Sequence, residues 1–132
     1  MSASQVYLKV RRVDAAVVAQ ARDLTVADVH ESMGTRGRAA LLGARMRPLK
    51  EGQPQIAGPA VTAFCWPGDN LMMHRALVLA QPGDVLVVVC QAELSGAQWG
   101  DLATRYALPT GLAGVVAAPF LSLSPSMSSD VI

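Results

Sequence analysis

Four consecutive residues, Gly100, Asp101, Leu102 and Ala103, form the part of the sequence best suited to bind or transform a small molecule. The apolar pattern after Asp101 indicates that a helix begins there, and the free N–H groups at a helix start attract carboxylates and phosphates. Gly100 has no side chain, so a ligand can approach the backbone closely. Asp101 could hold a metal-bound water or accept a proton. The alternative is that Asp101 only stabilises the start of the helix through the helix dipole.

The elements around these four residues place them at the edge of a sheet. Residues 85–90 are a continuous apolar, β-branched run, which is typical of a strand covered on both faces. A helix from Asp101 that ends before Gly111 leads to a second apolar run at residues 112–116. A crossover of this kind joins parallel strands and puts the loop after the first strand at the carboxyl edge of the sheet, where ligands usually bind. The predicted inner face of the helix consists of Leu102, Ala103, Tyr106 and Ala107.

Other side chains that commonly bind metals do not have the spacing of a metal motif. Neither H-E-x-x-H nor paired C-x-x-C occurs. The chain also lacks G-x-S-x-G, a Walker loop and G-x-G-x-x-G, which excludes the common hydrolase and nucleotide-binding signatures. The scattered ligand-type residues are Asp69, His74, Glu93 and Asp101.

A group of basic residues between residues 35 and 50 has two interpretations. It could bind an anion, or its charges could be solvated on a loop. No aromatic stacking residues are interleaved with the basic ones, which favours the solvated loop. The group consists of Arg36, Arg38, Arg45, Arg47 and Lys50.

The composition fits one α/β domain. The chain has 132 residues, of which 52% are hydrophobic and 5% aromatic, so we expect a core of Val, Leu and Ala. We expect this domain to cover residues 1–121 and the serine-rich residues 122–132 to form a flexible tail. The net charge is +1 and the basic residues are scattered, which argues against a nucleic-acid partner.

The two cysteines and the N-terminus indicate a cytoplasmic protein. Cys65 and Cys90 each end an apolar run, which is typical of buried thiols in a reducing compartment rather than of a disulfide framework. Residues 1–10 contain no long apolar signal-peptide region. No run of about 18 apolar residues occurs, so we expect no membrane span.

The remaining elements can be predicted from caps and apolar patterns. We expect a short helix at residues 14–22. A second helix begins at Thr25, which forms a capping box with Asp28, and ends at Gly34. The other predicted elements are a strand at residues 56–65 with a bulge or an edge feature at Gly58 and Pro59, and a helix at residues 71–80 capped by Asp69 or Asn70.

Five segments, in this order along the chain, resemble the RraA-like family. Each motif is modest alone, but five in the right order are specific. The family includes the class II 4-hydroxy-4-methyl-2-oxoglutarate (HMG) and 4-carboxy-4-hydroxy-2-oxoadipate (CHA) aldolases and the regulator of ribonuclease activity A. The segments are VHESMG at residues 29–34, IAGPAVT at 56–62, PGDNLMMHRAL at 67–77, AQPGDVLVV at 80–88, and residues 99–116, which begin WGDL.

The resemblance implies a fold, an assembly and a reaction. The fold is a swivelling three-layer β/β/α domain, and the assembly is a homotrimer or a hexamer made of two trimers. The aldolases cleave or decarboxylate oxo-acids, including oxaloacetate, through a pyruvate enolate that magnesium or manganese stabilises. By resemblance, Asp101 is the catalytic residue and orients the metal-bound water that carries the proton. Gly100, Leu102 and Ala103 belong to the loop that binds the oxo-acid.

The resemblance ends after Val116. At a fixed distance from the acidic residue the family has an Arg that binds substrate and an Asp that binds metal, and Ser122 and Leu123 occupy these positions here. Serine has no positive charge for a carboxylate and leucine is no metal ligand. We therefore expect an impaired aldolase, encoded by a truncated or frame-shifted gene. The unpaired edge and apolar surface expected at residues 115–121 predict low solubility.

Two other functions are compatible with the same sequence. The first is a non-catalytic regulator that binds ribonuclease E, as the regulator branch of the family does. Neither of the two absent residues is needed to bind a protein, so their loss is compatible with this role. The second is an inactive remnant of the enzyme.

Overall fold

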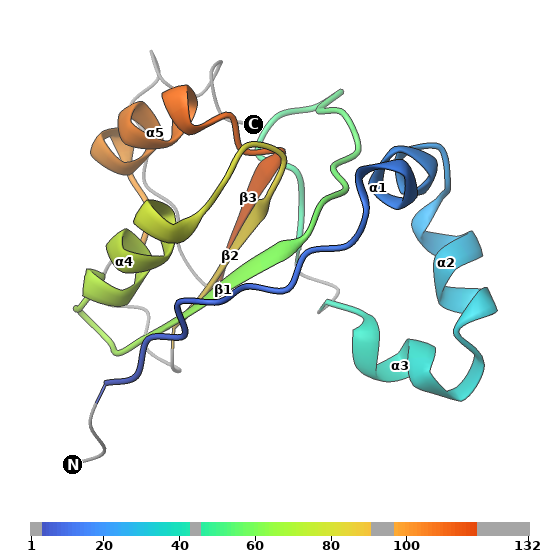
Figure 1. The fold of residues 1–132 in the computed structure, drawn as a ribbon, viewed down its shortest axis with the longest axis horizontal. Coiled ribbons are helices and arrows are strands. Elements are labelled where there is room, and N and C mark those ends of the chain that lie inside the picture. The colour runs from blue at the N-terminus through green and yellow to red at the C-terminus, as the bar shows by residue number, and fades with distance from the viewer. Residues whose placement is uncertain (1–3, 43–45, 91–96, 119–132) are drawn as a thin grey trace.

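The described part of the chain is built on a parallel sheet of three strands with helices packed against one face (Figure 1). The computed structural model describes residues 4–42, 46–90 and 97–118. The strands lie in the order β1 (Ala60–Cys65), β2 (Val85–Cys90) and β3 (Gly114–Ala118). The predicted α/β class is confirmed, and so are the strand at residues 85–90 and its parallel crossover to the next strand.

The first strand is shorter than the predicted residues 56–65. It begins at Ala60, because Pro59 has no N–H to donate and the backbone at Gly58 lies against the turn before β2. A Cβ at Gly58 would lie 2.2 Å from the carbonyl oxygen of Gly83. Val85 N donates to Pro59 O over 2.8 Å, which starts the pairing of the two strands.

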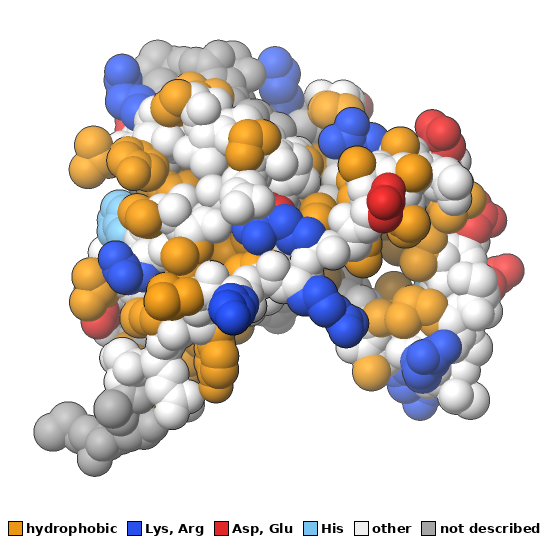
Figure 2. Space-filling view, in the orientation of Figure 1, with side chains coloured by type: hydrophobic (Ala, Val, Ile, Leu, Met, Phe, Trp, Pro, Cys, Tyr) orange, Lys and Arg blue, Asp and Glu red, His pale blue; other side chains and the backbone are white. Residues whose placement is uncertain are grey.

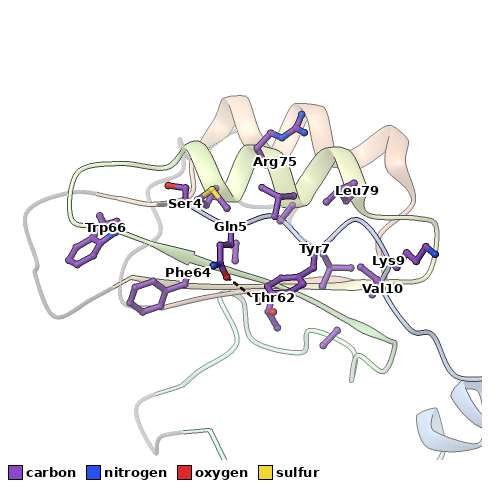
Figure 3. Close-up of a pocket in the computed structure, with 16 residues that line it drawn as sticks. Ser4, Gln5, Tyr7, Lys9, Val10, Thr62, Phe64, Trp66, Arg75 and Leu79 are labelled. Atoms are coloured by element: carbon purple, nitrogen blue, oxygen red, sulfur yellow. Dashed lines mark hydrogen bonds between the residues drawn. The ribbon is translucent and has the colours of Figure 1, made fainter. Parts of the chain in front are cut away.

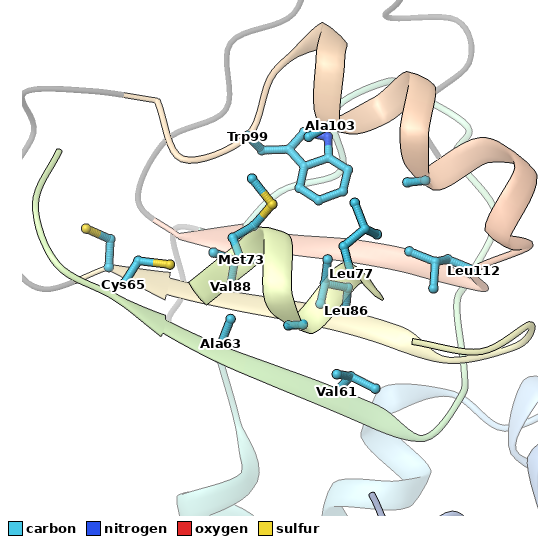
Figure 4. Close-up of a cluster of buried hydrophobic side chains, with 13 residues drawn as sticks. Val61, Ala63, Cys65, Met73, Leu77, Leu86, Val88, Trp99, Ala103 and Leu112 are labelled. Carbon is cyan, nitrogen blue, oxygen red and sulfur yellow. The ribbon is translucent and has the colours of Figure 1, made fainter. Parts of the chain in front are cut away.

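Two helices cover one face of the sheet and supply most of the remaining core (Figures 1 and 4). Helix α4 (Leu71–Leu79) lies between β1 and β2 in the chain, and helix α5 (Asp101–Ala107) lies between β2 and β3. The buried cluster combines β-branched and leucine side chains of the strands with one large aromatic residue. Its members are Val61, Ala63, Cys65, Met73, Ala76, Leu77, Leu86, Val88, Cys90, Trp99, Ala103, Ala107 and Leu112.

The inner face predicted for α5 is half wrong. Ala103 and Ala107 are buried as expected, but Leu102 is 77% exposed and Tyr106 is 56% exposed. Thr104 takes their place in the interior because its hydroxyl accepts a hydrogen bond from the indole of Trp99 over 2.8 Å. The buried indole thus turns the helix so that a polar residue faces inward.

Both cysteines are free and buried, which confirms their interpretation as buried thiols. Cys65 and Cys90 are neighbours at the ends of β1 and β2. Burial raises the pKa of the Cys65 thiol, so this group is less acidic than an exposed cysteine.

The N-terminal helices are held by caps rather than by burial. Helix α1 (Ala15–Arg22) begins at Asp14, and helix α2 (Val26–Ser32) begins with the predicted capping box of Thr25 and Asp28. Neither helix contains a buried residue. The first part of residues 35–50, predicted to be a loop, is helical, because Gly34–Arg36 forms a 3-10 turn and Gly37–Ala40 forms the short helix α3.

An ion pair fixes the N-terminal strap (residues 4–13) to the sheet. Arg12 Nη2 lies 2.7 Å from Asp84 Oδ2 and Arg12 Nε lies 2.9 Å from Asp84 Oδ1, so the contact is bidentate. Gln81 N also donates to Asp84 over 2.8 Å. Burial alone would raise the pKa of Asp84, but these hydrogen bonds and the charge of Arg12 hold the pKa below its usual value.

The predicted three-layer β/β/α fold requires a second sheet, and the predicted unpaired edge concerns the last strand and the residues after it. No second sheet covers the other face within the described residues. Strand β3 is the last strand in the described sheet and its residues 115–118 are half-buried, while residues 119–121 and the predicted tail lie outside the described residues. None of the helices in the described part is long and apolar enough to cross a membrane.

Candidate functional site

A hollow of about 400 Å³ lies at the carboxyl edge of the sheet, between the starts of α4 and α5. All four residues singled out in the sequence, Gly100 to Ala103 in order, line this hollow. Helix α4 contributes a second wall, and residues 97–99 complete the lining. Beyond these four residues, the side chains at the hollow include Asn70, Met73, His74, Gln98 and Trp99.

Trp99 and Thr104 fix the loop that carries Gly100. The indole of Trp99 is 2% exposed and packs among the core side chains near Met73 and Leu77 (Figure 4). Thr104 Oγ1 accepts from this indole and donates to the carbonyl of Gly100 over 3.1 Å. Thr104 N donates to the same carbonyl over 3.0 Å. These bonds set the backbone position of Gly100 at the rim of the hollow.

The three residues after Gly100 offer different groups to the hollow. Asp101 is half-buried at the first position of α5. Neither Leu102 nor Ala103 has a polar side chain, and that of Ala103 is only 4% exposed. The polar groups that these two residues can offer a ligand are therefore their backbone groups. Their N–H groups belong to the first turn of α5, where no intrahelical acceptor is available.

Gln98 is a functional candidate that the sequence did not reveal. It is 2% exposed and lines the hollow, and its Oε1 has no hydrogen-bond partner within the described part of the chain. Buried polar atoms are nearly always paired, so an unpaired acceptor at a hollow favours a ligand that donates a hydrogen bond. A glutamine before a tryptophan carries no sequence signal that would have identified it.

His74 is one of the scattered residues of metal-ligand type, and the fold brings it to the same hollow as Asp101. Asp69 has a different role, because its Oδ1 accepts from Leu71 N over 2.8 Å and so caps the start of α4. This bond supports the predicted capping role of Asp69. Glu93, Ser122 and Leu123 lie outside the described residues.

The described residues do not by themselves provide a metal site. No group of three or more His, Cys, Asp or Glu side chains that could hold a metal ion occurs among them. Asp101 and His74 are two such side chains at the hollow, one fewer than that minimum. The role of Asp101 toward magnesium or manganese therefore stays a prediction.

Comparison with known proteins agrees with the resemblance found in the sequence. Over 75 residues the chain is 37% identical to a protein of Halalkalibacterium halodurans named "Putative 4-hydroxy-4-methyl-2-oxoglutarate aldolase". The alignment covers 57% of this chain and 35% of that relative, so the chain matches about a third of the relative's length. The family model described as RraA-like, Aldolase/RraA, matches residues 26–119, which include β1 to β3 and the whole hollow. The chain therefore belongs to the RraA-like family of aldolases and RraA proteins.

Proposed function

We propose that the hollow binds a small oxo-acid of the pyruvate type and that the chain descends from the HMG/CHA aldolases with oxaloacetate decarboxylase activity. The observation that carries this proposal is the placement of residues 100–103 and His74 around one hollow in a chain of the aldolase family. The name of the bacterial relative gives the same substrate class for that protein.

The residues at the hollow suit the two ends of such a substrate. The N–H groups of Leu102 and Ala103 can donate to its carboxylate. Gln98 Oε1 can accept from the 4-hydroxyl of HMG as the substrate binds, and the hydroxyl turns to Asp101 for the reaction. In a retro-aldol cleavage, Asp101 takes the proton of that hydroxyl. The carbon–carbon bond then breaks, its electron pair forms the enolate of one pyruvate, and the hydroxyl carbon becomes the carbonyl of the other product.

We further propose that turnover by this chain is impaired. Family aldolases are generally metal-dependent, and the described residues lack a donor set for a metal ion. Ser122 and Leu123 stand where the resemblance places the substrate-binding Arg and the metal-binding Asp. No step is therefore assigned to a metal in this chain, and we expect binding of oxo-acid with little or no release of pyruvate.

Two measurements on the full chain test this proposal. The first is an NMR titration with pyruvate, in which the indole N–H of Trp99 should shift and Asp101→Asn should weaken the response. The exposed Trp66 is an internal control, and Asp23→Asn is the matched control variant because Asp23 is exposed and distant in sequence. No shift at Trp99 would contradict the binding site.

The second measurement is coupled pyruvate release with magnesium or manganese, using oxaloacetate and HMG. We expect no release above the metal-only blank. Release that is lost in Asp101→Ala would show that other residues replace the Arg-Asp pair, and the proposed impairment would be wrong.

An alternative proposal is a regulator that binds ribonuclease E. The observation that favours it is the pair Ser122 and Leu123, since the Arg and Asp that the resemblance places there serve catalysis and neither is needed to bind a protein. A pull-down with purified ribonuclease E tests it, and failure to bind at micromolar concentrations would remove its support.

A further inference from the structure

A second cavity, distinct from the hollow at α5, runs along the outer edge of β1. This β1 groove has a volume of about 600 Å³ and is lined by the N-terminal strap, β1 and one side of α4 (Figure 3). Five consecutive residues of β1, 60–64, line it. Since successive side chains of a strand point to opposite faces, such a run means that the groove follows the strand edge and not one face.

Within the part of the chain that the structure describes, one edge of β1 carries backbone groups without a backbone partner. The strand pairs with β2 on one side and with no other described strand. Val85 N donates to Pro59 O, so by the alternation of parallel pairing the N–H and C=O groups of Ala60, Thr62 and Phe64 point to the outer edge. No backbone hydrogen bond joins the described strap to these residues. An open strand edge of this kind is a template for adding another strand.

The opposite wall of the groove is an extended segment that runs antiparallel to β1. Ser4 and Trp66 lie at one end of the groove in Figure 3, and Lys9 and Val10 lie at the other. At that second end, Arg12 bonds to Asp84 just before β2 and anchors the strap. The strap thus runs along β1 as the second wall of the groove, and within the described residues it forms no backbone hydrogen bond with the edge of the strand.

The charges of the groove select the kind of segment that would fit. Lys9 and Arg75 are the charged side chains that line it within the described residues, and neither forms an ion pair there. Figure 2 shows Lys and Arg side chains along this face, whereas Asp and Glu gather mainly over α1 and α2. Exposed aromatic rings add apolar contact area beside the two cations. These rings are Tyr7, Phe64 and Trp66, which are 77%, 55% and 60% exposed.

We propose that the β1 groove binds an extended, acidic peptide segment of a partner protein, which adds to β1 as a fourth strand. Backbone pairing with Ala60, Thr62 and Phe64 would give affinity, and carboxylates beside Lys9 and Arg75 would give selectivity. A second copy of this chain is a poorer occupant. Its own extended strap carries Lys9 and Arg11 and would bring like charges together, since Arg12 is already paired with Asp84.

An NMR titration of the isotope-labelled full chain tests this proposal with a defined probe. The probe is a blocked peptide of alternating Glu and Val with six residues, the length of β1. We expect amide shifts at Ala60, Thr62 and Phe64, and none around the capping box at Thr25. A matched peptide with Lys in place of Glu should bind roughly tenfold or more weakly. Absence of shifts at β1, or equal binding of the Lys peptide, would overturn the proposal.

Protein variants and a modified peptide separate the contribution of the charges to binding from that of the backbone hydrogen bonds. The double change Lys9→Glu with Arg75→Glu should weaken binding of the Glu peptide roughly tenfold, whereas Arg105→Glu, on the exposed face of α5, should leave it unchanged. A Glu peptide N-methylated at alternate residues loses the donors for pairing and should bind at least as weakly as the Lys peptide. Undiminished binding of the methylated peptide would indicate a site for small anions and overturn strand addition. Sedimentation that shows self-association through β1 would overturn it in favour of a second copy.

Discussion

The two halves of the described chain contain helices of similar length but are stabilised differently. In residues 60–118 two helices and three strands enclose a core whose buried hydrophobic residues run from Val61 to Leu112. In the described residues 4–59, the one buried residue is Gly37. The first region is held by apolar surface removed from water, and the second by helix caps and the ion pair of Arg12 with Asp84.

This difference separates global from local stability. Burying one leucine contributes about 1.5–3 kcal/mol, whereas one helix cap contributes about 1 kcal/mol. Segments with little buried surface open at low free energy without unfolding the rest of a protein. We therefore expect residues 14–42 to open locally while the β/α region unfolds as one cooperative unit. Four changes test this expectation.

The largest effect should come from the core. Leu77→Ala removes a side chain that is 1% exposed and should lower the free energy of unfolding by about 2–5 kcal/mol. Leu102→Ala is the matched control, because that leucine is 77% exposed and should change the free energy by less than about 0.5 kcal/mol. Urea unfolding measures both, and equal effects would contradict the assigned core.

The ion pair should have the next largest effect, because it joins the two regions. Asp84→Asn removes a buried carboxylate that accepts from Arg12 and Gln81, which should lower the free energy of unfolding by about 1.5–3 kcal/mol. The folded-state pKa of Asp84 is lowered, so its stabilisation is present above the unfolded pKa of about 3.9 and is lost as the pH falls toward the folded pKa. Unfolding measured between about pH 6 and pH 2 should therefore show a shallower loss of stability in Asp84→Asn than in the wild type. Identical pH profiles would count against the ion pair.

A smaller effect is expected where the chain enters β1. Gly58→Ala places a Cβ against the backbone carbonyl of Gly83, which cannot rotate away, and should cost about 1–3 kcal/mol. Gly114→Ala is the comparison, since its Cβ would lie 2.6 Å from Cδ1 of the Ile56 side chain rather than against a backbone carbonyl, and should cost less. Thermal unfolding of both variants checks the order, and a larger loss in Gly114→Ala would refute this account of the start of β1.

The smallest global effect should come from the capping box. Thr25→Ala removes the acceptor for Asp28 N and should destabilise α2 by about 1 kcal/mol. Hydrogen exchange of residues 26–32 should accelerate while the midpoint of global unfolding barely moves. Thr35→Ala, at an exposed position outside α2, is the control. A clear shift of the global midpoint would show that the two regions unfold together.

Much of the fold could be predicted because its signals are local. The run of valines at residues 85–90, the capping box at Thr25 and the turn at Gly111 each depend on neighbours in the sequence, and all three are present. The rotation of α5 could not be predicted, since it depends on the indole of Trp99 reaching Thr104 in the interior. A pattern of apolar residues cannot anticipate a buried polar pair.

Some features of the candidate site, like those of the fold, could be predicted from the sequence, and others could not. The sequence by itself determined the family, the strand, loop and helix order, and the segment at residues 100–103, because these are carried by contiguous motifs. The tertiary structure alone brought His74 to that segment, and among the described residues it left one edge of β1 unpaired beside the strap. Such contacts join residues far apart in the chain, and their geometry follows from how the helices pack on the sheet rather than from any local pattern.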